Sequence, residues 1–284
     1  GLSSQLVPIG LLAGVLASPF YIKILSQLTN LTTMKSKYPS SNSKPLDNAK
    51  TTRLNKFLSN AGLCSRREAD EFIKMGLVHV NGKIVTEMGY KVKSNDEVKY
   101  DGSRVQQSPP VYILLNKPKG FVATSQGGKI NKSVQDLIRS GINTKVPPIG
   151  DMGRPMTGLL LFTNDESLRK KLNNSNSIPM IYQVVLDQNI TKEMMDKLKE
   201  GQIVFDKFQK VNVISNIHGK SKKEVGVEVH SLSPAIMVKL FSIVGVKVIQ
   251  MDRVIYGGLS KKDLPRGNWR KLSTKEIGFM KMIP

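Results

Sequence analysis

The sequence predicts an α+β fold in two parts, and two patterns along the chain indicate it. In residues 53–102, two stretches with apolar residues at helical spacing precede two strand-like stretches joined by Asn81-Gly82, a dipeptide typical of tight hairpins. In residues 111–284, short apolar or alternating runs typical of strands are interleaved with helix-like segments. The 284 residues suffice for one large or two small domains with a real core.

Charge and composition narrow the choice of partner. The net charge of +21 favours a polyanion through summed potential and counterion release, with nucleic acid as the first candidate and an anionic membrane surface as the second. The single cysteine, Cys64, excludes an internal disulfide framework. His79, His218 and His230 are scattered and give no zinc spacing with it, so neither a metal nor a cofactor is predicted.

Residues 1–52 form an N-terminal extension with an apolar start and a polar, basic linker. Leu6–Leu25 is just long enough to span a bilayer, but its two prolines and Lys23 disfavour a membrane anchor. The alternatives are an extension packed on a partner and a residual targeting sequence. The absence of acidic residues before Asp47 is compatible with organelle import, although the arginines typical of a transit peptide are missing.

Residues 53–104 are predicted to form a small helix–helix–hairpin domain. Gly62 closes its first helix, the capping-box pattern Ser65–Glu68 opens the second, and Gly76 ends that helix. The segment closely resembles, without a gap, the small RNA-binding domain of a small-subunit ribosomal protein, tyrosyl-tRNA synthetases and ribosomal pseudouridine synthases. Its basic residues away from the apolar stripes, or beside the hairpin, are predicted to contact RNA phosphates: Arg53, Lys56, Arg66, Arg67, Lys74 and Lys83.

After a linker at residues 105–110, residues 111–284 carry three further motifs. Asn116-Lys117-Pro118-Lys119-Gly120 follows an apolar run, Ile149–Asp165 reads IGDMGRPMTGLLLFTND, and residues 235–245 read AIMVKLFSIVG. They resemble the opening, active-site and third motifs of pseudouridine synthases of the ribosomal RsuA/RluB type. The resemblance implies a pseudouridine synthase fold, in which a mixed, mainly antiparallel sheet is flanked by helices.

The resemblance also implies where the active site lies and that its charged pair is replaced. The family's catalytic Asp falls on Gly153, or on Met156 if the loop is shortened, and the Arg that pairs with it falls on Val238. Asp151 is the nearest acid, and Tyr182 occupies the place of the family's active-site Tyr, with core packing as the alternative for a Tyr in a strand. The charged partners are missing together, so no catalytic residue is predicted. Four basic residues of this domain are predicted to bind RNA: Lys117, Lys119, Arg154 and Lys239.

These features predict a catalytically inactive homologue that serves as an rRNA-binding structural component of a mitochondrial ribosome, in the matrix. Its expected partners are ribosomal RNA and, through residues 1–52, neighbouring ribosomal proteins, with no membrane and no small-molecule substrate. The alternative is an active rRNA pseudouridine synthase that uses Asp151 in a rearranged loop, or a ribosome assembly factor.

Overall fold

The structure is a computed structural model that describes residues 51–124, 131–142 and 146–284. The extension, including Leu6–Leu25, lies outside the described residues. Among the helices that are described, none is long and apolar enough to cross a membrane. The described chain forms two compact units, one within residues 51–111 and the other made of Tyr112–Ser140 and Pro147–Pro284.

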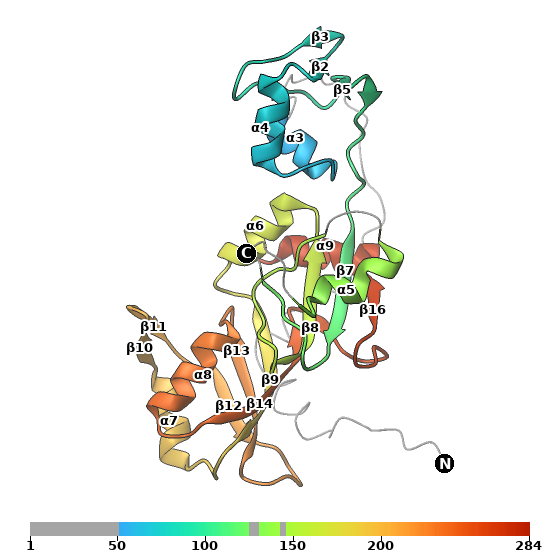
Figure 1. Ribbon diagram of the computed structural model, residues 1–284. Helices are drawn as coiled ribbons and strands as arrows, with labels where there is room; N and C mark the ends of the chain where they lie inside the picture. Colours follow the sequence, from blue (N-terminus) through green and yellow to red (C-terminus); the bar gives the residue numbers. More distant parts are fainter. Residues whose placement is uncertain (1–50, 125–130, 143–145) are drawn as a thin grey trace, which may run out of the picture. The chain divides into compact units, whose positions relative to one another are not determined.

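The first unit combines two helices with short antiparallel strands (Figure 1). Its elements are β1 (Thr52–Arg53), α3 (Leu54–Asn60), α4 (Arg66–Lys74), β2 (Val78–Val80), β3 (Lys83–Ile84), β4 (Lys91–Val92), β5 (Val98–Tyr100) and β6 (Ser103–Arg104). The strands pair in the order β3-β2-β5-β6, and β1 pairs with β4. Ser65 and Glu68 form the predicted capping box. Asn81 and Gly82 have φ of 51° and 80°, as a two-residue type I′ hairpin turn requires.

An eight-stranded sheet organises the second unit. Its strands are β7 (Tyr112–Lys117), β8 (Thr157–Thr163), β9 (Pro179–Leu186), β12 (Val213–Asn216), β13 (Glu224–His230), β14 (Val248–Tyr256), β15 (Leu259–Ser260) and β16 (Trp269–Lys271). The order is β12-β13-β9-β14-β8-β7-β16, with β15 beside β14. β14 runs parallel to β8, whereas the other pairs in this sheet are antiparallel. The predicted mixed, mainly antiparallel sheet is therefore confirmed.

Helices and one extra hairpin complete the second unit (Figure 1). They are α5 (Val134–Ile138) with the 3-10 turn Arg139–Gly141, α6 (Glu166–Asn174), α7 (Lys192–Glu200), α8 (Pro234–Ile243), α9 (Thr274–Met282), and the strands β10 (Gln202–Val204) and β11 (Lys207–Gln209). Each of the five α-helices begins at a Ser, Thr or Asp whose side chain accepts a hydrogen bond from the first turn. Asp165, the last residue of the active-site motif, is the cap of α6, and its carboxylate also accepts a hydrogen bond of 2.6 Å from the Tyr112 hydroxyl.

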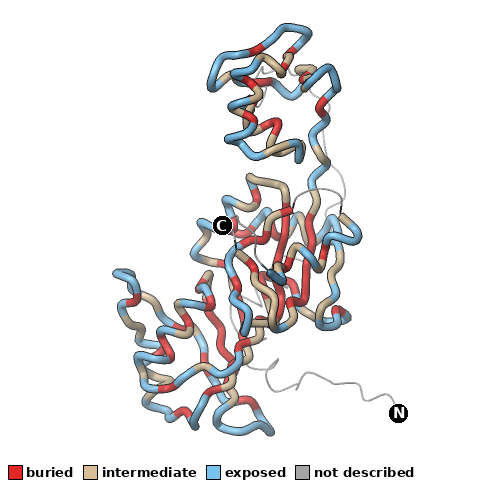
Figure 2. The backbone as a smooth tube through the Cα atoms, viewed as in Figure 1, coloured by how far each residue is buried: buried red, intermediate tan, exposed pale blue. Residues whose placement is uncertain are grey.

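The two faces of the sheet differ along β9 and β14. Tyr182 of β9 pairs with Arg253 of β14, and both side chains are buried. The next pair, Gln183 with Asp252, belongs to the opposite face and is only partly buried. Figure 2 shows the buried residues concentrated along the central strands. One face of these strands thus builds the core, and the other carries polar groups.

β8 and β14 approach each other closely at Gly158, the glycine that precedes the leucines of the motif. Gly158 has a φ of +105°, and a Cβ added there would lie 2.3 Å from the Arg253 carbonyl oxygen. Both the left-handed φ and the close approach therefore require a glycine. Strand packing therefore explains why the motif has a glycine at this position, without any role of the glycine in the reaction.

We expect Gly158→Ala to destabilise the protein by more than about 3 kcal/mol, because the backbone strain and a clash with another strand add. Gly267→Ala is the matched control, because Gly267 also has a positive φ, of +86°, but nothing lies within 4 Å of an added Cβ. Urea unfolding of both variants measures the difference. Equal losses of unfolding free energy would show that the approach of β14 to β8 is not tight.

Candidate active site and RNA interface

A buried lysine ties the opening motif to the active-site motif. Lys117, at the end of β7, is 0% exposed, and its Nζ donates hydrogen bonds to the carbonyl oxygens of Gly153 at 3.0 Å and Met156 at 2.5 Å. A neighbouring bond runs from the Gly120 N–H to the Arg154 carbonyl oxygen, at 2.8 Å. The predicted RNA contact of Lys117 is corrected accordingly, because a fully buried ammonium does not reach a phosphate; this side chain holds the loop before β8.

The surroundings of Lys117 disfavour its charge. Burial, followed by the positive charges of Arg266 and Arg154, lowers the pKa of Lys117 to about 8. Arg154 itself is exposed, and its guanidinium donates to the carbonyl oxygens of Gly120 at 2.9 Å and Asn131 at 2.8 Å. Arg154 therefore also braces the loop, while its exposure leaves the predicted RNA contact open.

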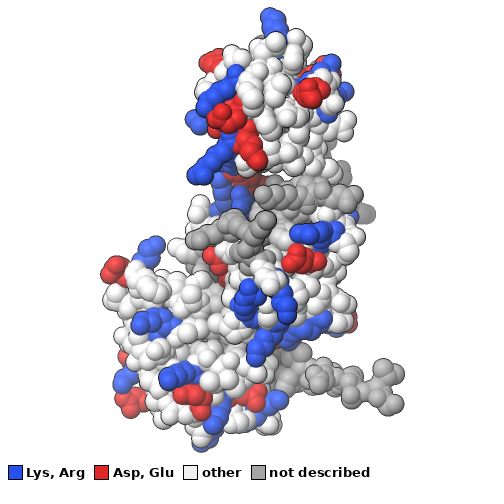
Figure 3. Space-filling view, viewed as in Figure 1, with Lys and Arg blue, Asp and Glu red and all other residues white. Residues whose placement is uncertain are grey.

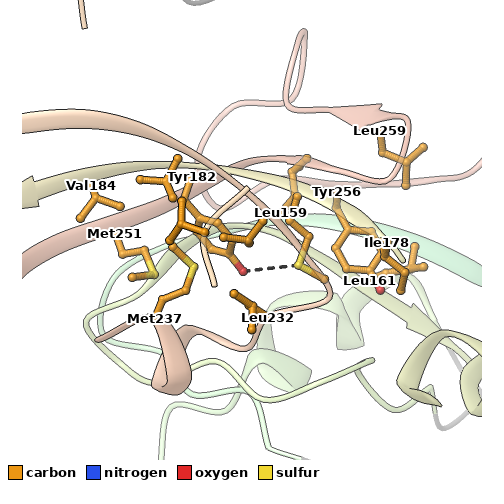
Figure 4. Close-up of a cluster of buried hydrophobic side chains, with 14 of the residues drawn as sticks. Leu159, Leu161, Ile178, Tyr182, Val184, Leu232, Met237, Met251, Tyr256 and Leu259 are labelled. Atoms are coloured by element: carbon orange, nitrogen blue, oxygen red, sulfur yellow. Dashed lines mark hydrogen bonds between the residues drawn. The ribbon is translucent and has the colours of Figure 1, made fainter. Parts of the chain in front are cut away.

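The face of the sheet that carries Tyr182 is closed by core packing (Figure 4). Tyr182 is 1% exposed, and its hydroxyl accepts a hydrogen bond of 3.2 Å from Nη1 of Arg253. Arg253 also donates to the Leu159 carbonyl oxygen at 2.7 Å, and its guanidinium lies 4.9 Å from the centre of the Tyr256 ring. Burial raises the pKa of Tyr256 to about 12. In this conformation Tyr182 is a core residue and does not reach a substrate base.

The other positions of the predicted site divide between the core and the surface. Val238 and Met156 are partly buried and pack against the core cluster. Gly153 and Asp151 are exposed in the loop before β8, and Lys239 is exposed on α8.

An open pocket of about 530 Å³ lies on the polar face of the sheet. Its lining comes from the opening turn, the active-site loop, the four strands β8, β9, β13 and β14, and the C-terminal segment: Lys119, Pro155, Thr157, Gln183, Val185, Glu224, Gln250, Met251, Asp252, Lys261 and Arg266. This volume falls within the range of small-molecule and nucleotide sites. Of these residues only Lys119 was a predicted site residue.

Asp252 is the centre of the hydrogen bonds in this pocket. Its Oδ1 accepts from the Thr157 hydroxyl at 2.6 Å and from Arg266 Nη1 at 2.8 Å, and its Oδ2 accepts from Lys261 Nζ at 2.6 Å. Burial opposes ionisation, but the bonds from Arg266, Lys261 and Thr157 outweigh it and lower the pKa of Asp252 to about 2. The carboxylate is therefore ionised at neutral pH and fixed by three donors.

Arg266 links this cluster to the opening motif. Its Nη1 also donates to Oδ1 of Asn116 at 2.6 Å, and Asn116 in turn donates to the Leu264 carbonyl oxygen at 2.8 Å. Figure 3 shows Lys and Arg side chains gathered over the region where β7 ends and β8 begins. The C-terminal segment and the two N-terminal motifs of this unit thus form one basic surface.

In the first unit, most of the predicted RNA contacts are on the surface. Arg53, Arg66, Arg67, Lys74 and Lys83 are exposed, and Lys56 is half-buried. Lys74 forms an ion pair of 2.9 Å with Glu71, which reduces the charge that it presents to RNA. Their arrangement suits contacts to a phosphate backbone, and the contacts themselves stay predictions.

Residues 52–98 match the S4 domain family, and residues 111–232 match the RNA pseudouridylate synthase family. Ribosomal large subunit pseudouridine synthase B of Bacillus subtilis is 34% identical over 236 residues, which cover 81% of this chain and 96% of that protein. The chain belongs to the RNA pseudouridine synthase family. The dual-specificity RNA pseudouridine synthase RluF of Escherichia coli K12 is 32% identical over 243 residues, covering 82% of this chain and 80% of RluF.

The fold agrees with this membership. A solved pseudouridylate synthase structure superposes with a TM-score of 0.57 at 22% identity, covering 80% of this chain and 99% of that one. The predicted resemblance and fold are confirmed by these findings. RNA binding follows from the S4 and synthase families together.

The same relatives correct the predicted function. The Bacillus subtilis and Escherichia coli proteins are both named as pseudouridine synthases, so the prediction of an inactive structural component of an organellar ribosome is contradicted. The classification as a pseudoenzyme is corrected for the same reason. It rested on single positions in two motifs, whereas the similarity extends over 81% of the chain. The alignment that places Gly153 or Met156 at the family's Asp stays a prediction.

Sequence reasoning missed Asp252, Lys261 and Arg266. A sequence signal existed in part, because Asp252 is an acid inside a strand-like run that contains Ile249, Met251 and Val254, although Gln250 and Arg253 interrupt its apolar pattern. Its donor Thr157 lies 95 residues away in the chain, so the pairing depends on the parallel contact of β8 with β14.

The pKa of Lys117 predicts a pH dependence. Between about 8 in the folded protein and 10.5 in the unfolded chain, the unfolded chain binds this proton and the folded protein does not, so stability rises with pH. Lys117→Met removes this titrating group and its contribution to the pH dependence. The unfolding free energy of the wild type relative to Lys117→Met should therefore increase by about 2 kcal/mol between about pH 8 and about pH 10.

Urea unfolding at the two pH values tests this, with the exposed Lys271→Met as the control. A difference between wild type and Lys117→Met that stays constant with pH would contradict the lowered pKa of Lys117.

Proposed function

We propose that this chain is a pseudouridine synthase that acts on ribosomal RNA. The observation that carries the proposal is the family match over both parts of the chain, an S4 domain followed by a synthase domain. The Bacillus subtilis relative, named as a synthase of the ribosomal large subunit, supports ribosomal RNA as the substrate class. The net charge of +21 suits a large polyanionic substrate.

The reaction is an isomerisation. The bond from ribose C1′ to N1 of uracil breaks, the base turns, and a bond from C1′ to C5 forms, while C5 loses a proton and N1 gains one. No oxidant, reductant or cofactor enters this balance. The protein has to extract a uridine from its RNA context, present a carboxylate to the ribose and keep the detached base in place.

We assign the carboxylate to Asp151. It is exposed, and it lies in the loop where the resemblance expects the active site, between Gly150, with a φ of +77°, and the exposed Gly153. These glycines give the loop conformational freedom. Asp252 is the less suitable acid because its two oxygens already accept three hydrogen bonds and its pKa is about 2, which makes it a weak base and nucleophile.

Asp151→Asn is expected to lower the rate of pseudouridine formation by about four orders of magnitude, because it removes the acid that attacks or deprotonates the sugar. The measurement is tritium release from ribosomal RNA labelled at uracil C5. Asp263→Asn, an exposed acid outside the pocket lining, is the matched control and should retain the wild-type rate.

Two results would overturn parts of this proposal. Wild-type protein that binds ribosomal RNA but releases no tritium would remove the enzymatic function. An active Asp151→Asn variant together with an inactive, folded Asp252→Asn variant would transfer the chemical role to Asp252.

We also propose that the protein works in the mitochondrial matrix on ribosomal particles, where residues 1–52 contact neighbouring ribosomal proteins. The basic, acid-poor composition of the residues before Asp47 supports this location. Residues 1–52 fused to a fluorescent protein are expected to direct it to mitochondria. A fusion that stays in the cytosol would contradict the location without bearing on the enzymatic activity.

A further inference from the structure

The geometry points to a specific RNA-backbone site in the pocket on the polar face of the sheet, where Asp252 positions Arg266 and Lys261 to bind a phosphate of the substrate strand. This inference rests on the proposed RNA substrate, but it concerns binding and not the chemical step. The site lies on the opposite face of β9 and β14 from Tyr182. Asp252 acts through the two cations and is a positioning residue.

The first argument is the concentration of positive charge. Lys119, Lys261 and Arg266 line the pocket, and the positive charges of Arg266 and Arg154 both act on the buried Lys117. The acids of the lining are Asp252 and Glu224. The three cations of the lining therefore exceed its two acids by one charge, and the basic surface over the end of β7 in Figure 3 agrees. Such a surface attracts a phosphate backbone.

The second argument is that the cations are held in place. Lys261 is 29% exposed in its side chain and forms a 2.6 Å bond to Asp252, so its long chain is already ordered before RNA binds. Arg266 is oriented by two side-chain acceptors through one nitrogen, Nη1, at 2.6 Å from Asn116 and 2.8 Å from Asp252. Its side chain is still 41% exposed. A guanidinium has further donors in a fixed plane, so this orientation presents them to a ligand.

The third argument concerns groups beside the cations. Thr157, Gln183 and Gln250 line the same pocket, and hydroxyl and amide groups complement the sugar and base that accompany a phosphate. Gln183 is itself oriented by a 3.4 Å contact from its Nε2 to Glu224. A free phosphate ion would leave these groups without a ligand contact, whereas the sugar and base of an RNA nucleotide would contact them.

Asp252→Asn gives the decisive test because two explanations of the role of Asp252 predict opposite changes in the affinity for RNA. If Asp252 only adds negative charge beside RNA, its neutralisation strengthens binding. If it positions Arg266 and Lys261, neutralisation weakens binding about tenfold, as the loss of an orienting partner commonly does. The probe is a stem–loop RNA transcript with an all-uridine loop, and fluorescence anisotropy gives the Kd over a range of salt concentrations.

Asp263→Asn is the matched control. Asp263 is exposed and lies outside the pocket lining, and its replacement changes the net charge equally. We expect Asp263→Asn to bind RNA as tightly as wild type or more tightly. Tighter binding by Asp252→Asn as well would overturn the positioning role.

Arg266 and Lys261 provide a second measurement that does not depend on the folding of Asp252→Asn. Arg266→Ala and Lys261→Ala should each reduce the slope of log Kd against log salt by about one, because each removes one phosphate contact. Arg266→Lys keeps the charge but loses the planar guanidinium with its several donors. The slope of log Kd against log salt should therefore stay unchanged while the affinity for RNA falls. Unchanged slopes in both alanine variants would overturn the site.

Inorganic phosphate distinguishes the source of the anion. Displacement of RNA by millimolar phosphate, but not by chloride at equal ionic strength, would mean a free-phosphate site and would overturn the assignment to RNA backbone. These binding results are independent of turnover: intact RNA binding without pseudouridine formation would remove the proposed chemistry and leave this site standing.

Discussion

The arrangement of the second unit depends on the burial of one ammonium group. Lys117 ends a strand whose six residues are all buried, and its Nζ bonds to carbonyl oxygens of the loop before β8. A buried cation without hydrogen-bond partners is strongly unfavourable, so the loop has to present its carbonyl groups inward. The opening motif therefore fixes the backbone of the active-site motif, although the two are far apart in sequence. Nearby Arg154 and Gly120 reinforce the same connection.

The alternation of side chains along β9 and β14 then gives this sheet two chemical roles. Tyr182 and Arg253 face the core, where a carbonyl group and aromatic rings accommodate the guanidinium. Gln183 and Asp252, one residue along, face the pocket. A shift of one residue in register would exchange these roles and bury Asp252 among apolar groups. Register is thus specified by both faces, and Gly158 allows β8 to pack closely enough to complete the arrangement.

Local signals and long-range contacts explain what could be predicted from the sequence. The cap at Ser65 and the turn at Asn81-Gly82 involve neighbours in the chain, and the structure confirms both. The resemblance also indicated the sheet type. Short elements such as β11 and β16 were missed because three residues carry little periodicity. The burial of Lys117 and the bonds of Asp252 were missed because they depend on strand order and register, which local patterns do not specify.

The cluster around Asp252 shows why a basic site needs an acid. Arg266 and Arg154 both repel the charge of Lys117, and this repulsion contributes to its low pKa. One partly buried carboxylate, that of Asp252, offsets part of the repulsion by accepting three hydrogen bonds, while carbonyl oxygens accept hydrogen bonds from Lys117 and Arg154. The cluster stays folded without RNA, yet a positive excess remains. A phosphate therefore meets cations that are already oriented, which reduces the entropy lost on binding.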